Sequence, residues 1–260
     1  MRTIATERFY EQDSSEHINN NMIEICINKG INTIPAGFYA GRSNIVSVII
    51  SDGVKKIYGN VFSYCSDLIS ISMPDSIIYI GPRAFARCEK LESITIPQYV
   101  EELGNCPFLC CRNLSSVSFL AKKMVNGIFR GCRNISSIYI GENVQEIDPD
   151  IFIGCKRIKS IVVDANNMWF DSRDNCNAII EKKSDTLILG CNTSKVPKGV
   201  KHISNRAFED CGRMRNITLP DGLESIGSLP SSIQKIFIPK GTKDKFRQLL
   251  PRKKSKLIEH

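Results

Sequence analysis

The chain has 260 residues, of which 42% are hydrophobic, which is enough apolar side chain to bury a sizeable core. Charged residues make up 24%, so the composition does not indicate disorder, and no run approaches the roughly 18 apolar residues of a membrane span. The net charge is +8, but residues 239–260 hold eight Lys or Arg against two acids, a net of +6 (8 − 2). A basic field confined to one tail favours a nucleic-acid or membrane partner only weakly.

The N-terminal segment, 1–29, precedes any recognisable pattern, and we expect it to cap one end of the fold. Its opening, MRTIATERFYEQDSSEH, has no apolar core of a secretory signal. Two compartments stay open: the protein remains in the cytoplasm, or a leader has been removed from an exported protein.

A repeat dominates most of the remaining chain. Six copies share the pattern F-x-x-C-x-x-L-x-x-I-x-I-P, joined by a V-x-x-I-G-x-x-A-F bridge. They begin at Phe62, Phe85, Phe108, Phe129, Phe152 and Phe208, so the first five are almost evenly spaced and the last step is more than twice as long. A degenerate copy at 31–50 has Phe38 and then Gly41 where Cys would stand, and a truncated copy, IQKIFIP, closes the series at 233–239. About eight units are present.

The repeat predicts the fold. A unit of about 23 residues cannot bury its own apolar face, so neighbouring units stack into a solenoid. The L-x-x-I-x-I part alternates like a strand, and successive copies pair in parallel. The bridge turns back along the other face.

The template resembles the BspA-like leucine-rich repeats, over roughly residues 31–239. That resemblance implies a β-rich, α/β-type right-handed superhelix with a parallel β-sheet on its concave face. It also implies a recognition or adhesion role, often at bacterial surfaces, where members are placed on the cell surface or secreted.

Between Phe152 and Phe208 the repeat is interrupted by an insertion at about 165–195. NAII and TLIL flank the polar turn EKKSD, which predicts a β-hairpin. Folding it about Lys183 and Ser184 places Cys176 opposite Cys191, so a disulfide is geometrically possible in an oxidising compartment. Trp169 either covers the broken edge of the repeat or faces a ligand.

The chemistry of an enzyme is missing from the sequence. The three His are scattered, and there is no zinc-protease, nucleophile-elbow, phosphate-loop or dinucleotide motif. Cys106 and Cys110 form one C-x₃-C without the second pair of a zinc site. The repeat cysteines should stack as small buried hydrophobes. We therefore predict no catalysis, no metal and no cofactor.

Two surfaces are candidates for binding. The first is the outward face of the concave sheet, a row of small hydroxyls that becomes more apolar toward the C-terminus: Ser93, Thr95, Ser116, Ser118, Ser137, Tyr139, Ser160, Val162 and Phe237. Aromatic residues dominate binding hot spots, so Tyr139 is the predicted anchor. The second is a basic ridge at the turn after each Cys: Arg87, Lys90, Arg112, Arg130, Arg133, Lys156, Arg157 and Arg213. Aromatics are not interleaved with this ridge, which disfavours single-stranded nucleic acid.

The expected organisation is an N-terminal cap (1–29), a solenoid (30–239) with its insertion, and a basic helical cap (240–260). In the last segment Phe246, Leu249 and Leu250 share one helix face and Pro251 ends the helix. The leading hypothesis is a non-enzymatic module that binds a protein or glycan in an adhesion or host-interaction context. An intracellular protein-interaction scaffold is the alternative, and nucleic-acid binding a distant third. The sequence does not indicate the identity of the ligand or the oligomeric state.

Overall fold

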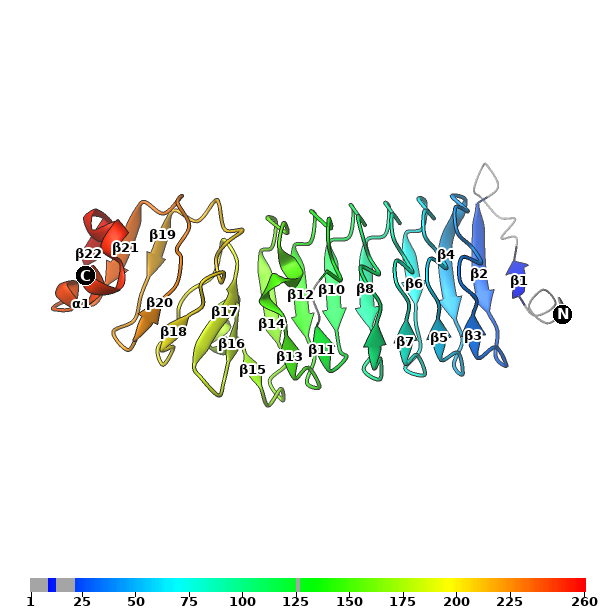
Figure 1. Ribbon diagram of the computed structural model, residues 1–260, viewed down its shortest axis with the longest axis horizontal. Coiled ribbons are helices and arrows are strands. Elements are labelled where there is room, and N and C mark those ends of the chain that lie inside the picture. Colours follow the sequence, from blue (N-terminus) through cyan, green and yellow to red (C-terminus); the bar gives the residue numbers. More distant parts are fainter. Residues whose placement is uncertain (1–8, 13–21, 125–126) are drawn as a thin grey trace. The chain divides into compact units, whose positions relative to one another are not determined.

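The computed structural model describes residues 9–12, 22–124 and 127–260. The chain divides into two compact units, one of residues 1–135 with 146–155 and one of residues 136–145 with 156–260. Both units are built from short strands joined by turns, which Figure 1 shows following one another in chain order within each unit. Among the described residues one α-helix occurs, and no helix is long and apolar enough to cross a membrane.

The first unit has two series of strands, one for each side of the repeat. The longer strands are β1 (Phe9–Gln12), β2 (Ile23–Ile27), β4 (Ile45–Ile50), β6 (Ser70–Ser72), β8 (Ser93–Ile96) and β10 (Ser116–Phe119). The order β1-β2-β4-β6 forms one sheet, in which β1 is antiparallel to β2 and the others are parallel. The predicted N-terminal cap, 1–29, lies largely outside the described residues, and its boundary stays a prediction.

The bridge segments supply the second series in this unit: β3 (Thr33–Ile34), β5 (Lys56–Ile57), β7 (Tyr79–Ile80), β9 (Glu102–Leu103), β11 (Lys123–Met124) and β13 (Glu146–Ile147). Strands β3, β5, β7 and β9 pair in parallel in that order, as do β11 and β13. Partners such as Tyr79 and Glu102 lie one repeat apart in the sequence. Equivalent residues of successive repeats face each other, so the repeat period of the sequence sets the register of the sheet. A short 3₁₀ turn, η1 (Pro149–Phe152), completes the unit.

The second unit continues the same construction around the insertion. Its elements are β12 (Ser137–Ile140), β14 (Ser160–Val163), β15 (Phe170–Asp171), η2 (Arg173–Asn175), β16 (Ala178–Glu181), β17 (Thr186–Gly190), β18 (His202–Ile203), β19 (Asn216–Thr218), β20 (Ser225–Ile226), β21 (Lys235–Ile238), α1 (Lys243–Leu249), η3 (Pro251–Lys256) and β22 (Leu257–Glu259). Strands β12 and β14 pair in parallel, the order β15-β16-β17-β18-β20 forms a sheet through the insertion, and β19, β21 and β22 form a third. The predicted fold class is confirmed: the chain is a β-rich leucine-rich-repeat solenoid with parallel sheets.

A column of stacked aromatic rings runs through the core of the first unit. The rings of Tyr39, Phe62 and Phe85 lie 5.3 and 5.4 Å apart, centre to centre, and those of Phe85 and Phe108 lie 5.2 Å apart. Phe129 and Phe152 extend the column at 5.8 and 5.7 Å. The predicted alignment of the degenerate first copy is therefore wrong by one residue. Tyr39, not Phe38, stands in the column, and Arg42, not Gly41, takes the cysteine position.

Five of the six turns in the first unit contain two residues with positive φ, and the turn at η1 contains one, Gly154. Of the two, one precedes the bridge aromatic and is Asn60, Arg83, Cys106 or a glycine, and the other precedes the repeat cysteine and is Tyr64, Arg87, Cys110 or a glycine. Cys106 (φ 51°) and Cys110 (φ 58°) thus occupy turn positions that Asn, Arg or Gly fill in other copies. Their C-x₃-C spacing follows from the turn geometry. No group of three or more His, Cys, Asp or Glu suited to a metal occurs among the described residues.

The insertion folds as an antiparallel hairpin of β16 and β17, but its register differs from the symmetric one. Near the turn Glu181 faces Thr186, as symmetry about residues 183–184 requires. A bulge between Ile179 and Ile180 then shifts the pairing by one residue, so that Ala178 faces Gly190. This shift removes the alignment on which the Cys176–Cys191 pairing was predicted. Both thiols are free in this structure.

The C-terminal segment covers the last repeat. Helix α1 places Phe246 in the core and leaves Leu249 half-buried against it, and Leu250, directly after the helix, is buried as well. Three lysines of the segment donate to backbone carbonyls of the last repeat: Lys245 to Asp221, Lys253 to Pro230 and Lys256 to Ile233. Much of the basic charge of the tail thus serves to satisfy carbonyls at the end of the stack. The boundary of this cap at residue 240 stays a prediction.

Candidate functional site

In the first unit the outward face of the long strands is a surface of small hydroxyls. The strand β8 alternates, with Ser93 and Thr95 exposed and Ile94 and Ile96 buried. Parallel pairing sets Ser93 against Ser116 and Thr95 against Ser118. Further along, Ser70 donates to Ser47 at 3.2 Å. The predicted positions therefore face outward and lie together, and Glu24 of β2, which faces Ser47, adds a carboxylate further along the same surface.

In the second unit the same face carries the predicted aromatic. Strands β12 and β14 set Ser137 against Ser160 and Tyr139 against Val162. The Val162 side chain is 46% exposed, which is unusual for a valine in a strand that buries both of its neighbours. The Tyr139 hydroxyl donates a hydrogen bond to the Asp164 carboxylate, one residue beyond β14. The ring is therefore held in one orientation over the sheet.

This contact shifts the titration of both partners. The hydrogen bond to Asp164, followed by burial, raises the pKa of Tyr139 to about 12. The same bond lowers the pKa of the Asp164 carboxyl, and the N–H of Asn166, 2.8 Å away, lowers it further. The hydroxyl therefore stays protonated and the carboxylate charged across the physiological range. The pair presents an aromatic ring next to a charged, hydrogen-bonding carboxylate.

Asn167 anchors the loop that follows this pair. Its amide is fully buried, and Nδ2 donates to the Gly141 and Val144 carbonyls at 2.8 and 2.9 Å. Its Oδ1 accepts from the N–H groups of Trp169 and Phe170 at 2.9 and 2.8 Å. All four hydrogen bonds of the amide are thus made. They tie the start of the insertion to the preceding repeat and leave the Trp169 side chain 40% exposed.

Phe237, the third apolar residue predicted for the face, is not brought to Tyr139. It lies in the sheet of β19, β21 and β22, where it faces Thr218 on one side and Ile258 on the other. Its ring packs against His260, with ring centres 6.0 Å apart. Phe237 is therefore half-covered by the C-terminal segment.

The basic residues at the turns are exposed, but acids accompany them. In the first unit Lys90 pairs with Asp67 at 2.7 Å, and Arg112 lies 4.0 Å from Glu89. The Arg87 guanidinium lies over the ring of Tyr64, 5.4 Å from its centre. The remaining members are exposed as well: Arg130 and Arg133 in the first unit, and Lys156, Arg157 and Arg213 in the second. The acid of one turn neighbours the base of the next, so these turns do not carry charge of one sign alone. Binding of an acidic partner by the basic residues stays a prediction.

The repeat cysteines have a defined role in packing. In the first unit the thiols of Cys65, Cys88 and Cys111 donate to the backbone carbonyls of Tyr39, Phe62 and Phe85, at 3.2, 3.2 and 3.1 Å. Each thiol thus bonds to the aromatic residue of the preceding repeat. Burial raises the pKa of Cys65 to about 12 and that of Cys88 well above its usual range. These thiols stay protonated, and a protonated thiol is a poor nucleophile.

Sequence reasoning missed Asp164 and Asn167. Both sit where the template has an apolar residue: Asp164 follows the strand where Pro97 stands in an earlier copy, and Asn167 takes the place of Val100. A polar residue at a buried repeat position was the available signal. Their partners lie 23 to 26 residues away, one repeat back, so the contacts could not be read from local sequence.

The comparisons with known proteins give the fold and the family. A model for the BspA type leucine rich repeat region matches six copies, at residues 3–69, 55–178 and 188–248. No curated protein sequence matches the chain. A leucine rich cell surface protein from Faecalibacterium prausnitzii A2-165 has a similar structure, with 26% identity and a TM-score of 0.61 over 82% of this chain. The chain spans 60% of the length of that protein.

Two more solved structures share the fold. The pneumococcal vaccine antigen PcpA is 19% identical, with a TM-score of 0.58 over 88% of this chain and 70% of its own. A leucine-rich repeat protein from Eubacterium ventriosum ATCC 27560 is 16% identical, with a TM-score of 0.52 over 85% of this chain and 68% of its own. The family and the cell-surface relative suggest a binding or recognition role. With its six matching copies and its solenoid of parallel strands, the chain belongs to the BspA-type leucine-rich repeat family.

Proposed function

We propose that the chain is a non-enzymatic binding module that holds a protein or glycan partner on the outward face of β12 and β14, in an adhesion or host-interaction context. The observation that carries the proposal is the Tyr139 ring, fixed by Asp164 beside the exposed Val162. The family and the cell-surface protein similar to this chain support a recognition role.

The geometry suits binding for a physical reason. An exposed tyrosine usually loses side-chain freedom when it binds, and this loss opposes association. The hydrogen bond to Asp164 already restrains the Tyr139 side chain, so less conformational freedom is lost when a ligand binds. Ser137 and Ser160 lie on the same face and offer hydroxyls that both donate and accept. A sugar ring could stack on Tyr139 while its hydroxyls bond to these groups, and a protein side chain could do the same.

The test is binding of the purified chain to a printed glycan array and to a panel of immobilised host extracellular proteins. Tyr139→Ala should weaken the strongest interaction at least tenfold, because truncating an aromatic hot spot commonly costs about 2 kcal/mol or more. Tyr139→Phe keeps the ring and removes the bond to Asp164, and should weaken it less.

The matched control is Tyr99→Ala, since Tyr99 is 60% exposed and lies in a turn of the first unit. It should leave binding unchanged. A ligand held equally well by Tyr139→Ala and Tyr99→Ala would show that the β12–β14 face is not the site.

A further inference from the structure

The last repeat is too short to form the turn that the other copies have. From the bridge glycine to the first position of the L-x-x-I-x-I strand pattern, Gly81 to Leu91 spans ten steps (91 − 81), but Gly227 to Ile233 spans six (233 − 227). Four residues are missing, and the F-x-x-C motif is lost with them. The repeat follows the template up to that glycine: a Cβ on Gly227 would lie 2.5 Å from the Asn205 Cα, as one on Gly104 would lie 2.2 Å from the Pro82 nitrogen.

The turn of the preceding copy lacks its usual neighbour. In the first unit the N–H of Phe62 donates to Ala84 at 2.7 Å and that of Phe85 to Pro107 at 2.8 Å, each across to the next turn. Within the part of the chain that the structure describes, the N–H of Phe208 donates to no acceptor, which is also true of Phe129 in the first unit. Leu229 is buried in the same core cluster as Phe208 and fills part of the space of the missing ring.

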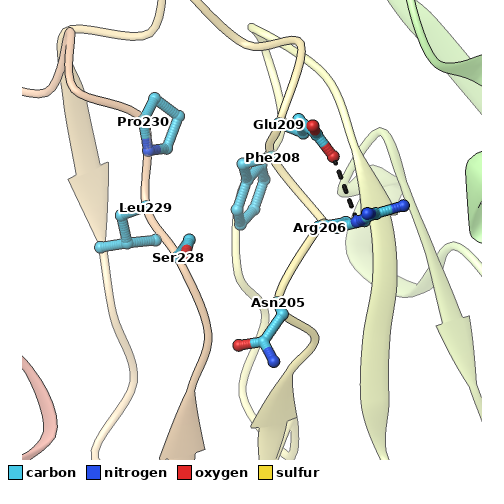
Figure 2. Close-up of a pocket in the computed structure, with 7 residues that line it drawn as sticks. All are labelled: Asn205, Arg206, Phe208, Glu209, Ser228, Leu229 and Pro230. Carbon is cyan, nitrogen blue, oxygen red and sulfur yellow. Dashed lines mark ion pairs between the residues drawn. The ribbon is translucent and has the colours of Figure 1, made fainter.

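A hollow lies where the missing turn would be. Figure 2 shows its walls: Asn205 and the Arg206–Glu209 ion pair on one side, and Ser228, Leu229 and Pro230 on the other. Its volume is about 420 Å³. A second hollow of about 290 Å³ shares Asn205, Ser228 and Leu229 and continues to Leu249, Arg252 and Lys253 of the C-terminal segment. The two hollows meet at the three shared residues and are together called the groove; each is about the size of a small ligand site.

The charge of the groove is positive. Arg206, Arg252 and Lys253 line it against a single acid, Glu209, which already pairs with Arg206 at 3.6 Å. The ammonium of Lys253 bonds to the Pro230 carbonyl at 3.0 Å and has no carboxylate partner among the described residues. Burial, reinforced by the charge of Lys256, lowers the pKa of Lys253. A carboxylate placed here would relieve this unfavourable environment.

We propose that this groove binds an extended, acidic peptide segment of a partner protein, which occupies the place of the missing turn. The floor of Leu229 and Pro230 takes apolar side chains, and the cations at its C-terminal end take a carboxylate. Nucleic acid fits less well, because the one aromatic of the lining, Phe208, is fully buried and offers no face for base stacking. The groove lies apart from the β12–β14 face and its use does not depend on the function proposed for Tyr139.

The experiment is a titration of the ¹⁵N-labelled full chain with the capped peptide Ac-Glu-Ala-Leu-Pro-Asp-Glu-NH₂ at low salt. Amide shifts should appear at Asn205, Ser228 and Lys253. The counterpart with three lysines in place of the acids should bind at least tenfold more weakly. Arg252→Glu should weaken the acidic peptide by a similar factor, whereas Arg213→Glu, the same change at an exposed turn of the same unit, should not.

A steric variant provides a second test. Ser228 is exposed, so Ser228→Trp should fold, which its thermal unfolding would verify, and should block the groove. The proposal is overturned if the acidic peptide shifts no amide of the groove, if both peptides bind alike, or if Arg252→Glu and Arg213→Glu behave alike. An oligothymidylate that shifts the same amides and displaces the peptide would assign the groove to nucleic acid instead. Tyr139→Ala should leave peptide binding intact, which separates the two sites.

Discussion

Replacing Asn167 by alanine removes a buried amide that ties the insertion to the preceding repeat through four hydrogen bonds. The substitution leaves the Gly141 and Val144 carbonyls without these donors, and the N–H groups of Trp169 and Phe170 without their acceptor. At roughly 1 kcal/mol for each bond, the free energy of unfolding should fall by about 4 kcal/mol. That is near the upper end for a single substitution.

The assay is urea denaturation followed by tryptophan fluorescence. Trp169 is the single tryptophan of the chain, and its backbone N–H donates to Asn167 Oδ1, so its fluorescence emission reports on this loop. The matched control is Asn166→Ala. The Asn166 side chain is exposed, and its loss should change the free energy of unfolding by less than about 0.5 kcal/mol. A loss below about 1 kcal/mol for Asn167→Ala, close to that of the control, would refute the assignment of four working hydrogen bonds.

Three more predictions follow from the contacts. Tyr139→Phe should cost less than about 1 kcal/mol at neutral pH, because the pair is near solvent. The raised pKa of Tyr139 contributes stability below pH 10 that is lost as the pH rises toward 12, and the lowered pKa of Asp164 contributes stability above its usual pKa that is lost in acid. Unfolding curves of the variant and the parent should therefore converge at both extremes; a constant difference would contradict the pairing. In a thiol titration of the native protein with a disulfide reagent, Cys26 and Cys110 should react quickly, because these two are only half-buried. The other nine of the eleven thiols are buried and should react only when the protein unfolds. Rapid labelling of Cys88 would disprove its burial. In thermal unfolding, Gly131→Ala should destabilise the protein more than Gly154→Ala. Both glycines have positive φ, but a new Cβ at residue 131 would lie 2.9 Å from Cys110 Sγ, whereas one at residue 154 would meet nothing within 4 Å. Equal losses would show that the contact relaxes freely.

Much of the fold could be predicted because its contacts repeat. A residue and its equivalent one period later, such as Ser93 and Ser116, must face each other in a parallel stack, so the period predicts the register. The same argument predicted the stacked, buried cysteines. It failed by one residue at the degenerate first copy, where FY offers two aromatics and only stacking on Phe62 identifies Tyr39.

The candidate sites were harder to predict, because they arise where the repeat changes. The register shift between Ile179 and Ile180 leaves Ile188 of TLIL without a partner, and nothing in that run marks it, so the register of the hairpin could not be known. Asp164 gains its importance from a hydroxyl one repeat away. The groove beside Phe208 exists because the last repeat is four residues shorter than the others. A search for copies of the repeat finds what matches the pattern and so does not detect residues that are missing. The candidate sites of this chain lie at positions where the sequence departs from the repeat pattern.

The lysines of the C-terminal segment have a consequence for how molecules of this chain meet one another. A parallel sheet that ended at β21 would offer a row of open carbonyls and amides, onto which a strand of another molecule could add. The three-residue strand β22 occupies that edge, and Lys245, Lys253 and Lys256 bond to the carbonyls around it. The positive charge there also repels a like-charged copy. The same side chains that complete the last repeat thus discourage end-to-end polymerisation at this edge.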